Sequence, residues 1–215
     1  MNCLDGMKQI KDNSVDLILT DPPYGIDYQS SRKTDKTKRH KKIKNDKQPY
    51  IWWLLEANRI LKDDGSLLCF CRWDTAESFK LAIEWAGFII KSQVIWGREH
   101  HGMGDLKSSF APQHDTIWFT TKGEFIFPNK RPKSIIRSKR LGGEQLTHPN
   151  EKPVDLIEQL ILSTSEENDL IADFFGGSGS TYEACIKLKR NYIGFELDEK
   201  YFEIINNRIE NIKIS

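Results

Sequence analysis

Cysteine is scarce in this 215-residue sequence, and its distribution excludes a metal-binding or disulfide framework. No two cysteines form a C-x-x-C pair or a zinc-type cluster with histidine. His100 and His101 are adjacent, so their side chains point in different directions. We therefore expect no bound metal and reduced thiols, and we expect those in an apolar strand pattern to be buried. The four cysteines are Cys3, Cys69, Cys71 and Cys185, and the apolar pattern holds Cys69 and Cys71.

Long apolar runs are also missing. No stretch stays apolar for the roughly 20 residues that a membrane-spanning helix needs. No signal peptide is recognisable either. We therefore expect a cytoplasmic protein with no membrane partner. The length fits one domain with a sizeable core.

Net charge is small, at +1, but it conceals an asymmetry. Residues 29–47 hold nine Lys or Arg and two Asp, a local charge of +7, so the rest of the chain carries −6. Residues 130–140 hold six Lys or Arg and no acidic residue. Two basic segments on a mildly acidic body favour binding to a polyanion. The alternative is a pair of solvated, partly disordered loops.

Short apolar strands alternate with amphipathic helices along the chain. This alternation predicts an α/β fold, a Rossmann-like doubly wound and mainly parallel sheet with helices on both faces. Asp74 and Glu77 resemble a capping box that opens a helix through Trp85. We expect strands at 15–20, 67–71, 88–96, 116–121, 170–174 and 192–195, and helices near 4–10, 50–61, 74–85, 153–163, 181–189 and 198–211. Residues 97–113 and 123–147 read as irregular.

A rigid polar corner follows the first predicted strand, in the sequence LTDPPYGIDY from Leu19 to Tyr28. It joins an acidic residue, two prolines and an aromatic residue. A plain turn is one explanation, because proline suits the exit from a strand. The alternative is a site that needs a carboxylate and a fixed backbone carbonyl.

A glycine-rich turn joins another buried strand to a helix, in the sequence IADFFGGSGSTYEA from Ile171 to Ala184. Glycines allow a tight turn and close approach of a ligand, and a helix start presents free N–H groups. Glu196 ends the next strand, where an acid can accept hydrogen bonds from the hydroxyls of a ribose. Together, the loop, the helix start and the acidic residue favour a binding site for an adenosine-type ligand over a purely structural turn.

These motifs together resemble the DNA amino-methyltransferases, which use S-adenosylmethionine. DPPY matches the catalytic motif of that family, DFFGGSGST its cofactor loop, and HPNEKPVDLIEQLI the segment that precedes the loop. The catalytic motif comes before the cofactor loop, as in the permuted β group, and the match is closest to the adenine-N6 enzymes. The resemblance implies one permuted domain over 1–215, with a catalytic part about 1–121 and a cofactor part about 148–215. Residues 29–48 would be a flexible basic loop, and 123–147 a small insertion for target recognition.

The resemblance also implies roles for individual residues. The Asp21 carboxylate and the Pro22 carbonyl would accept the two N–H groups of the substrate amine, Pro23 would keep the corner rigid, and an extruded base would stack on Tyr24. The cofactor would contact Asp173, Phe174, Phe175, Gly176, Gly177, Ser178, Gly179, Ser180, Thr181, Glu196, Lys152 and Asn2.

Some positions depart from the family pattern. Phe174 and Ser180 replace a common Pro and Thr of the cofactor loop. Asn2 stands where an Asp usually contacts the cofactor adenine, and we expect the short strand that usually precedes it to be clipped or absent.

Double-stranded DNA is the partner that the resemblance implies, while a homodimer and a cognate restriction enzyme stay open. The first basic loop would contact phosphates, and arginines of the second could read guanine. The residues assigned to DNA are Arg32, Lys33, Lys36, Lys38, Arg39, Lys41, Lys42, Lys130, Arg131, Lys133, Arg137, Lys139 and Arg140.

Three alternative functions remain at this point. An N4-cytosine DNA methyltransferase would share the fold and cofactor, although those enzymes more often carry Ser where this chain has Asp21. Methylation of a protein glutamine is disfavoured because its enzymes place the cofactor loop first. A truncated DNA-binding methylase with weak cofactor binding would explain the short N-terminal segment.

Overall fold

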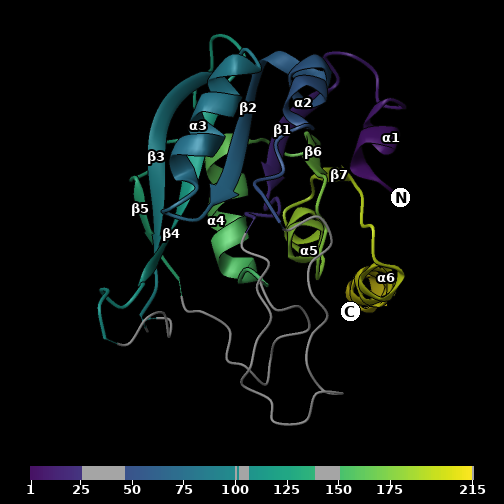
Figure 1. The fold of residues 1–215 in the computed structure, drawn as a ribbon. Helices are drawn as coiled ribbons and strands as arrows, with labels where there is room; N and C mark the ends of the chain where they lie inside the picture. The colour runs from purple at the N-terminus through teal and green to yellow at the C-terminus, as the bar shows by residue number, and fades with distance from the viewer. Residues whose placement is uncertain (26–46, 100, 102–106, 139–150, 215) are drawn as a thin grey trace.

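A seven-stranded sheet forms the centre of the protein, in the order β5-β3-β4-β2-β1-β6-β7 (Figure 1). The computed structural model describes residues 1–25, 47–99, 101, 107–138 and 151–214. Only β4 runs antiparallel to its neighbours, β2 and β3, and the other four strand pairs are parallel. The strands are β1 (Val15–Thr20), β2 (Leu61–Cys71), β3 (Ile89–Gly97), β4 (His114–Thr121), β5 (Ile135–Arg137), β6 (Leu170–Asp173) and β7 (Asn191–Gly194). The predicted α/β fold with a mainly parallel sheet is confirmed.

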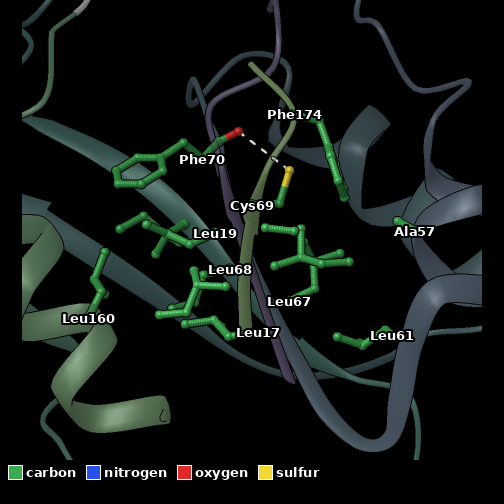
Figure 2. Packing of buried hydrophobic residues seen from close by; sticks show 14 of the residues in the cluster. Leu17, Leu19, Ala57, Leu61, Leu67, Leu68, Cys69, Phe70, Leu160 and Phe174 are labelled. Carbon is green, nitrogen blue, oxygen red and sulfur yellow. Dashed lines mark hydrogen bonds between the residues drawn. The ribbon is translucent and has the colours of Figure 1, made fainter. Parts of the chain in front are cut away.

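Helices cover both faces of this sheet, because the central strands are apolar on both sides. Figure 2 shows Leu17 and Leu68 on the side of Leu160 in α4, whereas Leu67 lies on the side of Ala57 in α2. The helices are α1 (Cys3–Met7), α2 (Leu54–Ile60), α3 (Ala76–Trp85), α4 (Val154–Thr164), α5 (Ser180–Lys187) and α6 (Glu199–Ile214). In the part of the chain that the structure describes, no helix is long and apolar enough to cross a membrane.

Strand β1 lies between β2 and β6, and this position decides where a site can form. Leu17 pairs with Ile171 and Ile18 with Ala172, so the carboxyl ends of β1 and β6 lie side by side. In parallel α/β sheets, ligands bind outside the carboxyl ends of strands where the strand order reverses.

Local structure departs from the sequence predictions at three places. Asp74 does not cap α3, because its carboxylate pairs with the guanidinium of Arg72 and the N-cap residue is Thr75. The helix predicted from residue 50 begins only at Leu54. The segment 123–147, predicted to be irregular, contains strand β5 at the sheet edge.

The first basic segment lies outside the described residues except for Lys47, whereas only the last two residues of the second, 139 and 140, lie outside them. The predicted DNA contacts at Arg32, Lys33, Lys36, Lys38, Arg39, Lys41, Lys42, Lys139 and Arg140 all lie outside the described residues.

Candidate active site

One cavity opens at the carboxyl ends of β1 and β6, and it contains both sequence motifs. Its wall includes the corner after β1 and the glycine loop after β6. Motifs about 150 residues apart in the chain are therefore brought together by the β1–β6 pairing. The predicted site residues on this wall are Asp21, Pro22, Pro23, Tyr24, Asp173, Phe174, Phe175, Gly176, Gly177, Ser178, Ser180, Thr181, Glu196, Lys152 and Asn2. Gly179 lies at the N-cap of α5.

The corner after β1 is fixed by the segment that precedes α2. The N–H of Tyr50 donates to the Pro23 carbonyl over 3.1 Å, and Tyr24 forms an isolated bridge with Pro49. Gly25 has a φ of +85°, and a Cβ there would lie 2.4 Å from the Gln48 backbone, so this close approach requires glycine. Among the described residues, no group donates a hydrogen bond to the Pro22 carbonyl. None of the described groups therefore occupies that carbonyl, and Pro22 lines the cavity.

The Asp21 carboxylate is held from two sides. The hydroxyl of Tyr24 donates to one oxygen, and the ammonium of Lys152 donates to the other. Tyr24 is buried, and its burial and then the charge of Asp21 raise its pKa well above 10.0. The phenol therefore stays protonated and remains a donor to the carboxylate.

The glycine loop packs against the end of β7. Gly176 donates its N–H to the Phe195 carbonyl over 2.9 Å, and a Cβ on Gly176 would lie 2.7 Å from the Tyr182 hydroxyl. Gly177 and Gly179 have φ values of +53° and +83°, in the left-handed region that favours glycine. The chain can therefore turn from β6 into α5 without side chains filling the cavity.

Glu196 is oriented by the backbone around it. One carboxylate oxygen accepts the Gly177 N–H over 2.8 Å, and the other accepts the N–H groups of Leu197 and Asp198, each over 2.8 Å. A carboxylate offers about four acceptor positions, so three are engaged and about one remains. The remaining position can accept a hydrogen bond from a ligand hydroxyl.

Asp173 is buried beneath the site and contacts several elements that form it. Its carboxylate accepts hydrogen bonds from the hydroxyls of Thr20 and Thr181, over 2.8 and 2.6 Å, and from the Phe175 N–H over 3.2 Å. These contacts tie β1, β6 and α5 together. Asp173 also lines the cavity, and its predicted contact with the cofactor stays a prediction. Burial raises the pKa of Asp173 to about 6, and the hydrogen bonds oppose this rise.

We expect Asp173 to make folding stability depend on pH. Its folded pKa of about 6 lies above the ordinary value of 3.8, so the folded protein binds this proton more tightly than the unfolded chain. The stabilisation is complete below about pH 4 and is lost as the pH rises to about 6, and it amounts to roughly 3 kcal/mol. Urea unfolding from pH 4 to 7, compared with Asp173→Asn, measures it. If the free energy of unfolding of the wild type does not fall relative to that of Asp173→Asn between pH 4 and pH 7, the prediction is contradicted.

Aromatic side chains form another part of the wall. Tyr50 meets Phe175 edge to face at 5.9 Å between ring centroids, and Phe195 stacks on Phe174 at 6.2 Å. Tyr50 lines the cavity, but the sequence reasoning missed it because it stood within a predicted helix. A tyrosine at the start of an apolar segment carried no signal of a site.

Asn2 also lies on the wall, where its side-chain oxygen caps α1. It accepts the Leu4 N–H over 3.0 Å. A contact between Asn2 and a ligand base stays a prediction.

The comparisons with known proteins agree with this geometry. Residues 15–207 match the N6/N4 family described as DNA methylase. A putative methylase of Escherichia coli, YubD, is 30% identical over 217 residues, covering 99% of this chain and 89% of that protein. The type II methyltransferase M2.MboI of Moraxella bovis is 28% identical, covering 98% and 86%. The chain therefore belongs to the N6/N4 DNA methylase family, whose members are S-adenosylmethionine-dependent DNA amino-methyltransferases.

Solved structures share the fold. The structure of the M1.HpyAVI–SAM complex aligns with a TM-score of 0.74 at 23% identity, covering 97% of this chain and 96% of that one. The cytosine-N4-specific PvuII DNA methyltransferase aligns with a TM-score of 0.71 at 19% identity, covering 98% and 91%.

The cavity suits S-adenosylmethionine, the cofactor of this family. The planar base needs an apolar surface, which the Tyr50, Phe175 and Phe195 rings can supply. The ribose needs an acceptor such as Glu196, and the glycine loop leaves backbone close to the ligand space. The residues present therefore fit the group.

Proposed function

We propose that this protein methylates the N6 amino group of an adenine flipped out of double-stranded DNA. The observation that carries the proposal is the placement of the Asp21 carboxylate and the open Pro22 carbonyl on the wall that also holds the glycine loop. Within the resemblance described above, Asp21 favours adenine over cytosine, because N4-cytosine enzymes more often have Ser at that position.

The chemistry needs acceptors more than it needs a strong base. The lone pair of an aromatic amine is delocalised into the ring, so the amine is a poor nucleophile. Asp21 accepts one N–H and the Pro22 carbonyl the other, which localises the lone pair toward the methyl donor. S-adenosylmethionine, when bound, would supply the methyl group from its sulfonium and leave as S-adenosylhomocysteine, and the proton that the nitrogen loses would pass by way of the Asp21 carboxylate to solvent. The Pro22–Pro23 backbone keeps the carbonyl aimed, so little reorganisation is needed during the reaction.

The methylated nucleoside identifies the target base. Purified protein is incubated with S-adenosylmethionine and mixed-sequence duplex DNA, and the digested nucleosides are resolved by mass spectrometry. We expect N6-methyldeoxyadenosine. N4-methyldeoxycytidine would support the cytosine alternative and contradict the adenine assignment, and a DNA product with neither base would contradict the proposed reaction.

The segment that leads into β5 is our candidate for base recognition. Lys130, Arg131, Lys133 and Arg137 are all exposed there, and β5 forms the sheet edge opposite β7 (Figure 1). Exposed arginines at an edge strand can reach a DNA groove without rearranging the core. This supports the proposal that 123–147 is the target-recognition segment of a single permuted domain.

We predict different mutant signatures for the two basic segments. Arg137→Ala should cost roughly 1–3 kcal/mol of binding on the correct site only, because a bidentate guanine contact is lost. Replacing Lys38, Lys41 and Lys42 together should weaken binding on all sequences and flatten the salt dependence. Titrations of cognate and scrambled duplexes at several salt concentrations measure both. The reverse pattern would show that the two segments were assigned the wrong way round.

Two assembly predictions accompany the proposal. We infer that a homodimer and a cognate restriction enzyme are the partners to test beside DNA. For the homodimer, we expect light scattering at micromolar protein concentration to give a molar mass twice that of the 25.0 kDa chain. A monomer mass under those conditions would contradict it.

A further inference from the structure

Lys152 contacts the carboxylate at the centre of the proposed chemistry. Its ammonium donates to Asp21, and its side chain is only 10% exposed. The nitrogen lies 5.0 Å from the centroid of the Phe70 ring and 5.8 Å from that of Tyr24. Two aromatic rings and a carboxylate therefore surround this cation. A buried ion pair is weak evidence for stability, because desolvation offsets the attraction, so its presence in the cavity asks for another reason.

The backbone that carries Lys152 is held on both sides. Glu151, whose side chain is 3% exposed, pairs with Arg208 of α6 over 2.8 Å, and Arg208 also donates to the Ser178 carbonyl over 3.0 Å. On the other side, Pro153 has a φ of −61° and forms the N-cap of α4. These contacts fix the position of Lys152 relative to the glycine loop, so the lysine is directed into the cavity and toward Asp21.

The other groups that face Asp21 are acidic or uncharged. Tyr24 comes from the same corner, Cys69 and Cys71 come from β2, and Asp173 comes from β6, while Asp115 of β4 acts on Tyr24 and Cys71. The Asp115 carboxylate forms an ion pair with the guanidinium of Arg98, with 3.6 Å between the nitrogen and the oxygen. Within the described residues, Lys152 is the cation that contacts Asp21. Without it, one of the two contacts that orient the carboxylate would be lost.

We propose that Lys152 is a positioning residue for methyl transfer, whose ammonium orients the Asp21 carboxylate to accept the amino group of the target base. This inference rests on the proposed function, and it gives the lysine a role different from contact with the cofactor. The Tyr24 hydroxyl holds one carboxylate oxygen and Lys152 the other. Remaining acceptor positions on the carboxylate, which has about four, are then available to the amine.

The first test compares Lys152→Met and Lys152→Arg in single-turnover methylation at saturating DNA and cofactor. Lys152→Met should lower the rate by about 100-fold, because a misplacement of about 1 Å at a reacting group can cost that much. Cofactor and DNA dissociation constants should stay within about threefold of the wild type. Lys152→Arg should restore part of the rate.

Lys62→Met is the matched control. Lys62 pairs with Asp16 over 2.5 Å near the beginning of β1, while the Lys152 pair lies at the other end of the strand. The control removes a lysine–aspartate pair of the same strand without touching the cavity. Its methylation rate should match that of the wild type.

A double-mutant cycle tests the pairing by rate and, independently of activity, by stability. In Asp21→Asn, adding Lys152→Met should produce no further loss of rate, and the urea midpoints of the two single changes should not add in the double variant. Additive midpoints, an unchanged rate in Lys152→Met, or a selective loss of cofactor affinity would each overturn the inference. A wild-type protein that methylates neither base would contradict the proposed function. A Lys152→Met protein that transfers methyl groups at the wild-type rate would contradict the inference alone.

Discussion

Asp21→Ala should abolish most methyl transfer while cofactor binding stays close to that of the wild type. The carboxylate is on the wall shared by the two motifs, but it contacts Tyr24 and Lys152, not the glycine loop. Its acceptor role is used mainly in the transition state, so its loss lowers the rate of the chemical step. Removing one preorganised hydrogen bond of this kind costs roughly 100-fold to 1000-fold. Single-turnover methylation and calorimetric titration of cofactor measure the two quantities.

The variant needs a stability check, because Asp21→Ala leaves the buried Lys152 ammonium without its carboxylate. Thermal unfolding in the presence and absence of cofactor provides that check. Asp63→Ala serves as the control, since the Asp63 side chain is 82% exposed and pairs with Lys122 at the far end of β2. A folded Asp21→Ala protein that methylates DNA at the wild-type rate would disprove the proposed mechanism.

Gly194→Ala should damage the cofactor site through the backbone. A Cβ at Gly194 would lie 2.0 Å from the Tyr182 hydroxyl and 2.2 Å from the Asp173 carbonyl oxygen. That carbonyl already accepts hydrogen bonds from Phe195 and Tyr182, so it has little room to move. Overpacking of this kind costs roughly 1–3 kcal/mol. If the strain is relieved by shifting the glycine loop, cofactor affinity falls about tenfold for each 1.4 kcal/mol.

Gly97→Ala is a fitting control for this change. An added Cβ at Gly97 would have the Ile136 carbonyl as its nearest neighbour, at an ordinary 3.9 Å. Both variants are compared by chemical unfolding and by cofactor titration. A Gly194→Ala protein with wild-type stability and affinity would show that β7 can move away from β6 at no cost.

The two strand ends and the loops that follow them could be predicted from the sequence, because each depends on residues that are adjacent in the chain. The buried strands around Asp21 and Asp173 are continuous apolar runs, and prolines or glycines mark where each one ends. The same local signals misled where a tertiary contact competed with them. Asp74 has the spacing of a helix cap, but the guanidinium of Arg72 takes its carboxylate.

The sequence by itself determined the fold class, the two motif loops and the family they resemble. Only the tertiary structure decided which groups meet in the cavity. Lys152 pairs with Asp21 across 131 residues, and Asp173 turns to Thr20 across 153. Strand periodicity describes which face of a strand is buried, but it carries no information about which side chain of a distant segment will lie opposite. That choice depends on the order and register of β1 and β6 and on the contacts that fix the backbone before α4.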